Sequence, residues 1–92
     1  MIRTISHRGL KRLYENNDSR GVLSQYVQKI ERILFALDNA EAIADVDLPG
    51  FRLHALKGDQ RGFWSIRLSG NWRIIFRFDG QDVTDIDLID YH

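Results

Sequence analysis

Apolar and basic residues alternate through residues 51–78, and this pattern constrains the fold more than any other feature of the chain. Such alternation is typical of β-strands that have one face on a core and the other in solvent. The segment carries six Arg or Lys residues and one acid, Asp59, whereas the whole chain has 13 basic and 13 acidic residues. Basic charge is therefore concentrated on the solvent face of a predicted sheet, where it is suited to meet an anion.

Side-chain parity divides this region and the segment after it into four predicted strands. They cover residues 51–55, 63–68, 72–78 and 82–89. Successive side chains of a strand point to opposite faces, so each strand has an apolar and a polar side. In the first strand, the residues predicted to face the core are Phe51, Leu53 and Ala55.

The loop between the second and third strands is predicted from the same parity. Gly70-Asn71 is a favourable two-residue hairpin sequence, but such a loop would place Ile66 beside Ile75 on the basic face. A three-residue loop over 69–71 keeps the apolar residues together, and Asn71 can adopt the left-handed conformation that it needs. The pairs that follow are Leu68–Trp72, Ile66–Ile74 and Trp64–Phe76.

The same test at Asp79-Gly80 predicts an odd-numbered loop before the last strand. A slip of one residue would move every apolar side chain to the other face, so parity fixes the choice. The predicted neighbours are Ile86 with Ile74, Leu88 with Trp72, and Asp87 with Arg73.

Two helices are predicted before the strands. Ile2 and Ile5 can form a short edge strand, and Ser6 can cap a first helix that ends in the polar loop 16–21. A second helix is predicted over 24–40. Its apolar stripe, about 120° wide at helical periodicity, consists of Tyr26, Val27, Ile30, Ile33, Leu34 and Leu37.

Phe35 lies outside this stripe and has two interpretations. Either the first helix or a loop covers it, or it contacts a protein partner, because an exposed Phe is a common anchor.

These elements predict an α+β fold in a single domain over 1–92. We expect an antiparallel sheet of four to five strands with two to three helices packed on one face. The opposite, open face is predicted to carry the cationic side chains Arg52, His54, Arg67, Arg73 and Arg77.

Composition limits the class of protein. The chain has no cysteine, so it contains no disulfide and no thiolate metal site. Its first residues are too few and too polar for a signal segment, and no apolar run approaches the length of a membrane helix, so we expect a cytoplasmic protein. An isoelectric point near 6.8 argues against a general nucleic-acid coat protein, which needs a strongly basic domain.

Side chains suited to acid–base chemistry come from two parts of the chain. His54 lies on the open face with Lys57 just after it, and the chain ends in Asp90, Tyr91 and His92. Together with guanidinium groups these residues suit metal-independent cleavage of RNA. Histidine can remove the 2'-hydroxyl proton or protonate the leaving oxygen, and cations stabilise the phosphorane-like transition state.

Plainer interpretations stand beside this one. A histidine on a strand surface or at a chain end is often only a polar surface residue, and a basic face can be only a solvated surface. A metal site is not expected, because the histidines lack ligand spacing. The residues alone leave open a catalytic site and a simple anion-binding face.

Six segments of the chain together form a family pattern. They are His7-Arg8-Gly9-Leu10-Lys11, Leu48-Pro49-Gly50-Phe51-Arg52-Leu53-His54, Leu56-Lys57-Gly58-Asp59, Gly62-Phe63-Trp64-Ser65-Ile66, Asn71-Trp72-Arg73-Ile74 and the terminal Asp90-Tyr91-His92. In this order and at these spacings, the sequence resembles the HigB branch of the RelE toxin superfamily over nearly its whole length. Ala55 stands where many members have proline, at a position of buried parity.

The resemblance implies a compact toxin that enters the ribosomal A site and cuts mRNA by 2'-hydroxyl attack without a metal or other cofactor. It also implies a helix-turn-helix antitoxin of the HigA type. The family's active-site pattern falls on His54, Lys57, Arg73, Asp90, Tyr91 and His92. Arg52, Arg67 and Arg77 are further expected substrate contacts.

The roles implied are a base and an acid supplied by His54 and His92, in either order. Asp90 would orient a histidine or transfer a proton, and Tyr91 would position the nucleotide. The alternatives are a non-catalytic toxin of the ParE type and an adaptor that uses the basic face only for binding.

Overall fold

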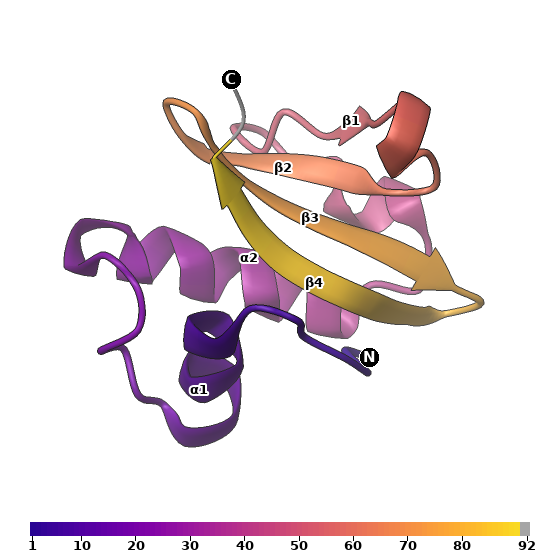
Figure 1. Cartoon of the computed structure of the whole chain (residues 1–92). Helices are drawn as coiled ribbons and strands as arrows, with labels where there is room; N and C mark the ends of the chain where they lie inside the picture. Colours follow the sequence, from indigo (N-terminus) through magenta and orange to yellow (C-terminus); the bar gives the residue numbers. More distant parts are fainter. Residues whose placement is uncertain (91–92) are drawn as a thin grey trace.

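The chain forms four antiparallel strands in the order β1-β2-β3-β4, with two α-helices on one side of the sheet (Figure 1). The computed structural model describes residues 1–90. Within them no helix is long and apolar enough to cross a bilayer. The architecture confirms the predicted α+β class. The elements are α1 (Arg8–Asn16), α2 (Val27–Asn39), β1 (His54–Ala55), β2 (Trp64–Ser69), β3 (Trp72–Asp79) and β4 (Asp82–Asp90), with 3-10 turns at Ser24–Tyr26, Ile43–Val46 and Gly58–Gln60.

The core lies between the helices and the inner face of the sheet. The predicted stripe of α2 is confirmed, since it buries Ile30, Ile33, Leu34 and Leu37. The two central strands contribute Ile66, Ile74 and Phe76, each 0% exposed. Burying each such side chain stabilises the fold by about 1.5–3 kcal/mol. The core therefore fixes the position of the sheet, and with it the open face.

Helix α1 begins after His7 and not, as predicted, after a Ser6 cap. The Nδ1 atom of His7 accepts a hydrogen bond from the backbone N–H of Leu10 (3.1 Å). An imidazole nitrogen thus satisfies one of the amides that a helix start leaves unpaired. The helix ends in the predicted loop, where Asn17 takes the left-handed conformation (φ 56°) that favours asparagine among non-glycine residues.

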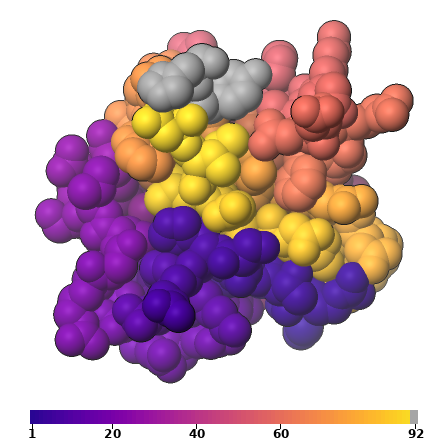
Figure 2. Space-filling view, viewed as in Figure 1, coloured from indigo at the N-terminus to yellow at the C-terminus, as the bar shows by residue number. Residues whose placement is uncertain are grey.

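The N-terminal residues cover the outer edge of β4. Ile2 and Ile5 form isolated parallel bridges with Val83 and Ile86, so they lie at the sheet edge as predicted but form bridges and not a continuous strand. Figure 2 shows the indigo N-terminal segment lying along the yellow β4. Unpaired strand edges invite association with other chains, so this cover protects one side of the sheet.

The first hairpin keeps the predicted register in its body but not at its loop. Trp64 pairs with Phe76 and Ile66 with Ile74 as predicted. The predicted Leu68–Trp72 pair is wrong, because Ser69 pairs with Trp72 and a bulge follows Arg67. The loop is therefore Gly70-Asn71, and Gly70, not Asn71, has the positive φ (51°). A two-residue loop plus a bulge has the same parity as a three-residue loop.

The second hairpin also combines a two-residue turn with a register shift. Its turn lies between the paired residues Asp79 and Asp82, and a register shift follows near Asp85, whose φ is 56°. Ile74 therefore pairs with Leu88, two positions along from the predicted Ile86. The predicted contact of Asp87 with Arg73 is wrong, because Asp87 pairs with Ile75 and Ile89 with Arg73.

The first strand is shorter than predicted. Arg52 has a φ of 49°, which interrupts extended backbone, and only His54–Ala55 pair with β2. Because of this kink, the side chains before and after Arg52 do not alternate regularly between the two faces of the sheet. Phe51 is buried, Leu53 is half-buried, and Ala55 is exposed and not, as predicted, in the core.

Candidate active site

A pocket of about 340 Å³ opens on the sheet face that points away from the helices. It lies over β1 and the paired part of β2 and β3, where His54 is opposite Ser65 and Arg67 is opposite Arg73. Four of the cationic or titratable side chains predicted for this face meet there. The residues that line the pocket are Arg52, His54, Leu56, Ser65, Arg67 and Arg73.

Arg67 and Arg73 form a directly opposed pair across β2 and β3. Their Cβ atoms are expected to be about 4.5–5.5 Å apart, a distance at which like charges destabilise a sheet. The guanidinium of Arg73 donates from Nη1 to the carbonyl oxygens of Gly70 (2.7 Å) and Trp72 (3.2 Å). These bonds orient Arg73 before any ligand arrives. An anion in the pocket would relieve the repulsion between the two cations.

His54 lies one row along the sheet from this pair. It is on β1, opposite Ser65 of β2, and its side chain is exposed, whereas Ser65 is only 5% exposed. Ser65 then pairs with Ile75, which is also 5% exposed although it lies on the open face. The imidazole thus stands at the rim of a floor made of small or apolar side chains.

The sequence did not single out Ser65 or Leu56 as site residues. Alternation along the second strand puts Ser65 on the same face as Phe63 and Arg67, and this is the only sequence signal that points to its side chain. A short, uncharged residue at this position leaves room for a ligand between larger neighbours.

Arg52 reaches the pocket because of the kink before β1. The backbone N–H of Arg67 donates to the Phe51 carbonyl (2.8 Å), which ties this bend to β2. The cationic field extends from here toward α2. Burial lowers the pKa of Lys29, and the positive charges of Arg67, Arg32 and Arg52 lower it further.

Lys57 and Arg77 lie apart from the pocket lining. Lys57 precedes the 3-10 turn Gly58–Gln60 and is exposed. The guanidinium of Arg77 lies 5.4 Å from the Phe63 ring centroid, within cation–π range, and 4.0 Å from a carboxylate oxygen of Asp85. Arg77 therefore lies on the open face, but it contacts Phe63 and Asp85 outside the pocket that holds His54.

The predicted C-terminal residues are placed only in part. Asp90 ends β4 and pairs with Trp72, and it is exposed. By alternation its position belongs to the face of Leu88 and Trp72, at the end of the strand, and not to the row of His54. Tyr91 and His92 lie outside the described residues.

The pocket is suited to an anion that must also exchange protons. Three guanidinium groups can bind phosphate oxygens, and the imidazole beside them has ring nitrogens that can accept or donate a proton. Among residues 1–90 no group of three His, Cys, Asp or Glu side chains is arranged to hold a metal ion.

Comparison with known proteins identifies the family of the chain. Residues 3–92 match the family described as the RelE-like toxin of type II toxin–antitoxin system HigB. Endoribonuclease HigB of Proteus vulgaris is 41% identical over 92 residues, the full length of both chains.

Solved structures share the fold at low sequence identity. A chain of the YoeB–YefM complex from Staphylococcus aureus has a TM-score of 0.63 and 22% identity, and the match covers 100% of this chain and 95% of that chain. A YafQ variant from E. coli also has a TM-score of 0.63, with 14% identity over 96% of this chain and 89% of its own. The family match and the full-length relative show that the chain belongs to the HigB-like family of RelE-like toxins of type II toxin–antitoxin systems.

Proposed function

We propose that this protein is an endoribonuclease toxin that cuts mRNA by attack of a 2'-hydroxyl on the adjacent phosphorus. One observation carries the proposal: His54 lines the same pocket as Arg52, Arg67 and Arg73. Its full-length relative from Proteus vulgaris bears the name of an endoribonuclease, which gives the same reaction class. An imidazole among guanidinium groups supplies proton transfer and charge stabilisation at one phosphate.

The reaction needs two proton transfers. A base takes the proton of the 2'-hydroxyl while its oxygen forms a bond to phosphorus. The bond from phosphorus to the 5'-oxygen then breaks, and an acid protonates that oxygen, which leaves a 2',3'-cyclic phosphate and a 5'-hydroxyl. His54 and His92 are the proposed base and acid, in either order, and each transfer is worth roughly 10² to 10⁴ in rate.

The cations act on the charge that develops during attack. Arg73 is held by two carbonyl oxygens, so little reorganisation is needed when the phosphorane-like state forms. Arg67 lies directly opposite and can bind the same phosphate. In this proposal Lys57 binds the phosphate as well, Asp90 orients a histidine, and Tyr91 positions the nucleotide.

The substrate is proposed to be mRNA in the ribosomal A site, which would make the cytoplasm the place of action. A chain of zero formal net charge has little general affinity for RNA, so a structured target that presents the strand is favoured over free RNA. As a type II toxin the protein is paired with an antitoxin. We propose that this antitoxin is of the helix-turn-helix HigA type.

Cleavage of a defined mRNA on translating ribosomes tests the proposal. The wild-type protein should cut within the A-site codon, and a single 2'-deoxy substitution on the 5' side of the cut should block the reaction. His54→Ala should lower the single-turnover rate by at least ~10²-fold, since it removes one proton transfer. Arg61→Ala is the matched control, because Arg61 is an exposed cation outside the pocket.

Two results would contradict the proposal. If the 2'-deoxy substrate is cut at the normal rate, the attacking group is not the 2'-hydroxyl. If both His54→Ala and the wild type arrest growth without any cleavage of mRNA, the protein is a non-catalytic toxin.

A further inference from the structure

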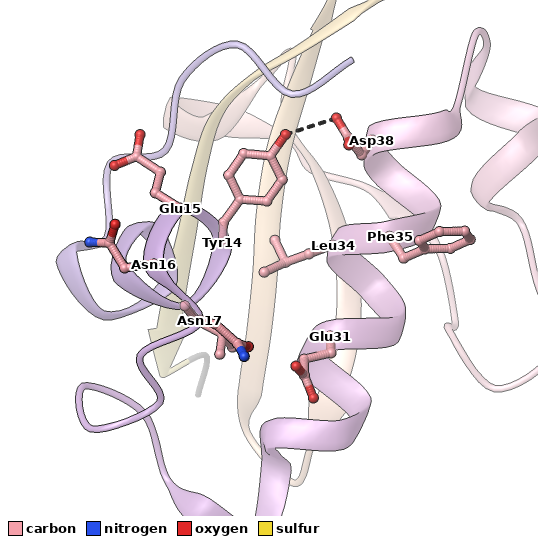
Figure 3. Close-up of a pocket in the computed structure, with 9 residues that line it drawn as sticks. Tyr14, Glu15, Asn16, Asn17, Glu31, Leu34, Phe35 and Asp38 are labelled. Atoms are coloured by element: carbon pink, nitrogen blue, oxygen red, sulfur yellow. Dashed lines mark hydrogen bonds between the residues drawn. The ribbon is translucent and has the colours of Figure 1, made fainter.

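The helix side of the molecule carries a hollow that the catalytic proposal does not use. It measures about 540 Å³ and lies between α1 and α2. Figure 3 shows Tyr14 of α1 and Leu34 of α2 pointing into the space between the helices. We call this hollow, with the Phe35 side chain beside it, the helix groove. The residues most relevant to it are Leu13, Tyr14, Glu31, Leu34, Phe35 and Asp38.

Phe35 forms a ridge at the border of this groove. Its side chain is 72% exposed and points away from α1 (Figure 3), so neither helix one nor a loop covers it. On its other side lies a second hollow of about 450 Å³, bordered by Ala36, Leu48 and Phe51. Leu48 and Tyr14 are also large apolar residues that remain exposed. An exposed aromatic between two hollows is typical of a protein-docking surface.

The charge of the helix groove is opposite to that of the sheet pocket. Glu15, Glu31 and Asp38 line it, and no Lys or Arg is among its described lining residues. Asp38 is also fixed in place, since one of its carboxylate oxygens accepts hydrogen bonds from the Ile2 N–H (2.9 Å) and the Tyr14 hydroxyl (3.0 Å). RNA would be repelled here, whereas a basic peptide would be attracted.

We propose that the helix groove binds an amphipathic helix of the antitoxin, with apolar side chains packed around Phe35 and Lys or Arg side chains beside Glu15 and Glu31. A helix that lays its apolar face into a groove between helices is a recurring mode of recognition. The positive sheet face would repel the same basic segment, so charge directs it to this side of the toxin. The proposal rests on the toxin–antitoxin pairing and not on the catalytic roles.

The first test is binding of the purified full-length cognate antitoxin to full-length toxin variants by calorimetry. Phe35→Ala should weaken binding roughly 30-fold, as expected for a central aromatic anchor. Leu23→Ala is the matched control, because Leu23 is 51% exposed but lines neither hollow, and it should bind like the wild type. Thermal unfolding of both variants shows whether the fold is intact.

The second test reverses a charge. Glu31→Lys should weaken antitoxin binding roughly fivefold at low salt, and the difference should shrink as salt rises. Glu41→Lys makes the same change at an exposed acid outside the groove and should have no such effect.

Three outcomes would overturn the proposal. The first is wild-type antitoxin binding by both Phe35→Ala and Glu31→Lys. The second is weaker antitoxin binding by Arg67→Ala or Arg73→Ala, which would place the antitoxin on the sheet face. The third is a toxin dimer in sedimentation that Phe35→Ala abolishes while antitoxin binding is unchanged, which would make a second copy the occupant. Each of these leaves mRNA cleavage by Phe35→Ala at the wild-type rate, so they are distinct from failure of the catalytic proposal.

Discussion

The two sides of this molecule differ in charge, although the chain as a whole is neutral. The sheet side gathers Arg52, Arg67 and Arg73 around His54 in a pocket of about 340 Å³. The helix side presents acidic side chains and an exposed Phe35 beside a groove of about 540 Å³. The first suits a phosphodiester and the second a basic, partly apolar peptide.

The difference also concerns rigidity and chemistry. Arg67 and Arg73 of the sheet side stand on paired strands, and Arg73 is also held by backbone carbonyls. The helix side offers apolar area and fixed negative charge but no imidazole among its described lining residues. The two proposals place the RNA site and the antitoxin site on opposite sides of one core. If the two sides are independent, a surface substitution on one side should leave the function of the other unchanged.

The largest effect is expected where the two sides meet, in the core. Phe76 is 0% exposed and stacks edge-on against Phe78 at a centroid distance of 6.0 Å. Phe76→Ala should lower the free energy of unfolding by about 3–5 kcal/mol and impair cleavage and antitoxin binding together. Phe35→Ala makes the same change on the surface and should alter stability by no more than about 0.5 kcal/mol. Urea unfolding of both variants measures this; similar losses would mean that Phe35 is part of the core.

The next effect should be confined to the sheet side. Arg73→Ala removes a preorientated guanidinium and should lower the single-turnover cleavage rate by roughly 10²- to 10³-fold. Antitoxin affinity, measured by calorimetry on the same sample, should stay at the wild-type value. Arg73→Lys retains the charge but not the fork of donors, so it should recover only part of the rate. Equal loss in cleavage and antitoxin binding would show that the two sides are coupled.

Much of the sheet could be predicted because parity survives errors in loop length. The pairs Trp64–Phe76 and Ile66–Ile74 were predicted although the loop was not. A three-residue loop and a two-residue loop with a bulge put the same side chains on the core. Parity cannot distinguish them, and only Gly70, which holds the positive φ, marks the shorter turn.

The site was predicted less completely because it depends on departures from regular strands. Alternation assumes extended backbone, but Arg52 has a φ of 49° and changes the parity before His54. The shift near Asp85 likewise moves Asp87 from Arg73 to Ile75. Neither departure occurs at a glycine, the residue that most often adopts a positive φ. Sequence therefore predicted which residues share the open face better than which of them touch.

A smaller effect separates the two sides by their response to salt. Each phosphate contact contributes to the salt dependence of RNA binding, so Arg67→Ala should reduce the slope of log affinity against log salt by about 0.7 for single-stranded RNA. Fluorescence anisotropy with a 2'-deoxy oligonucleotide, which is not cut, measures this slope. Arg61→Ala should leave it unchanged, because Arg61 is outside the pocket lining. An unchanged slope for Arg67→Ala would remove that residue from the phosphate-binding set.

The smallest effect concerns the titration of Tyr14 in the helix groove. Burial raises the pKa of the Tyr14 phenol, and the hydrogen bond that it donates to Asp38 raises it further. A raised pKa in the folded state stabilises the protein below the unfolded pKa of about 10, and this contribution is lost as pH rises through the folded value. Ultraviolet titration should therefore show a tyrosine component that ionises above the usual range, and Tyr14→Phe should remove that component. Saturating antitoxin should shift the same component further upward, because a docked helix excludes more water from the phenol. If the component does not respond to the antitoxin, the groove stays open in the complex and the separation of the two sides needs another explanation.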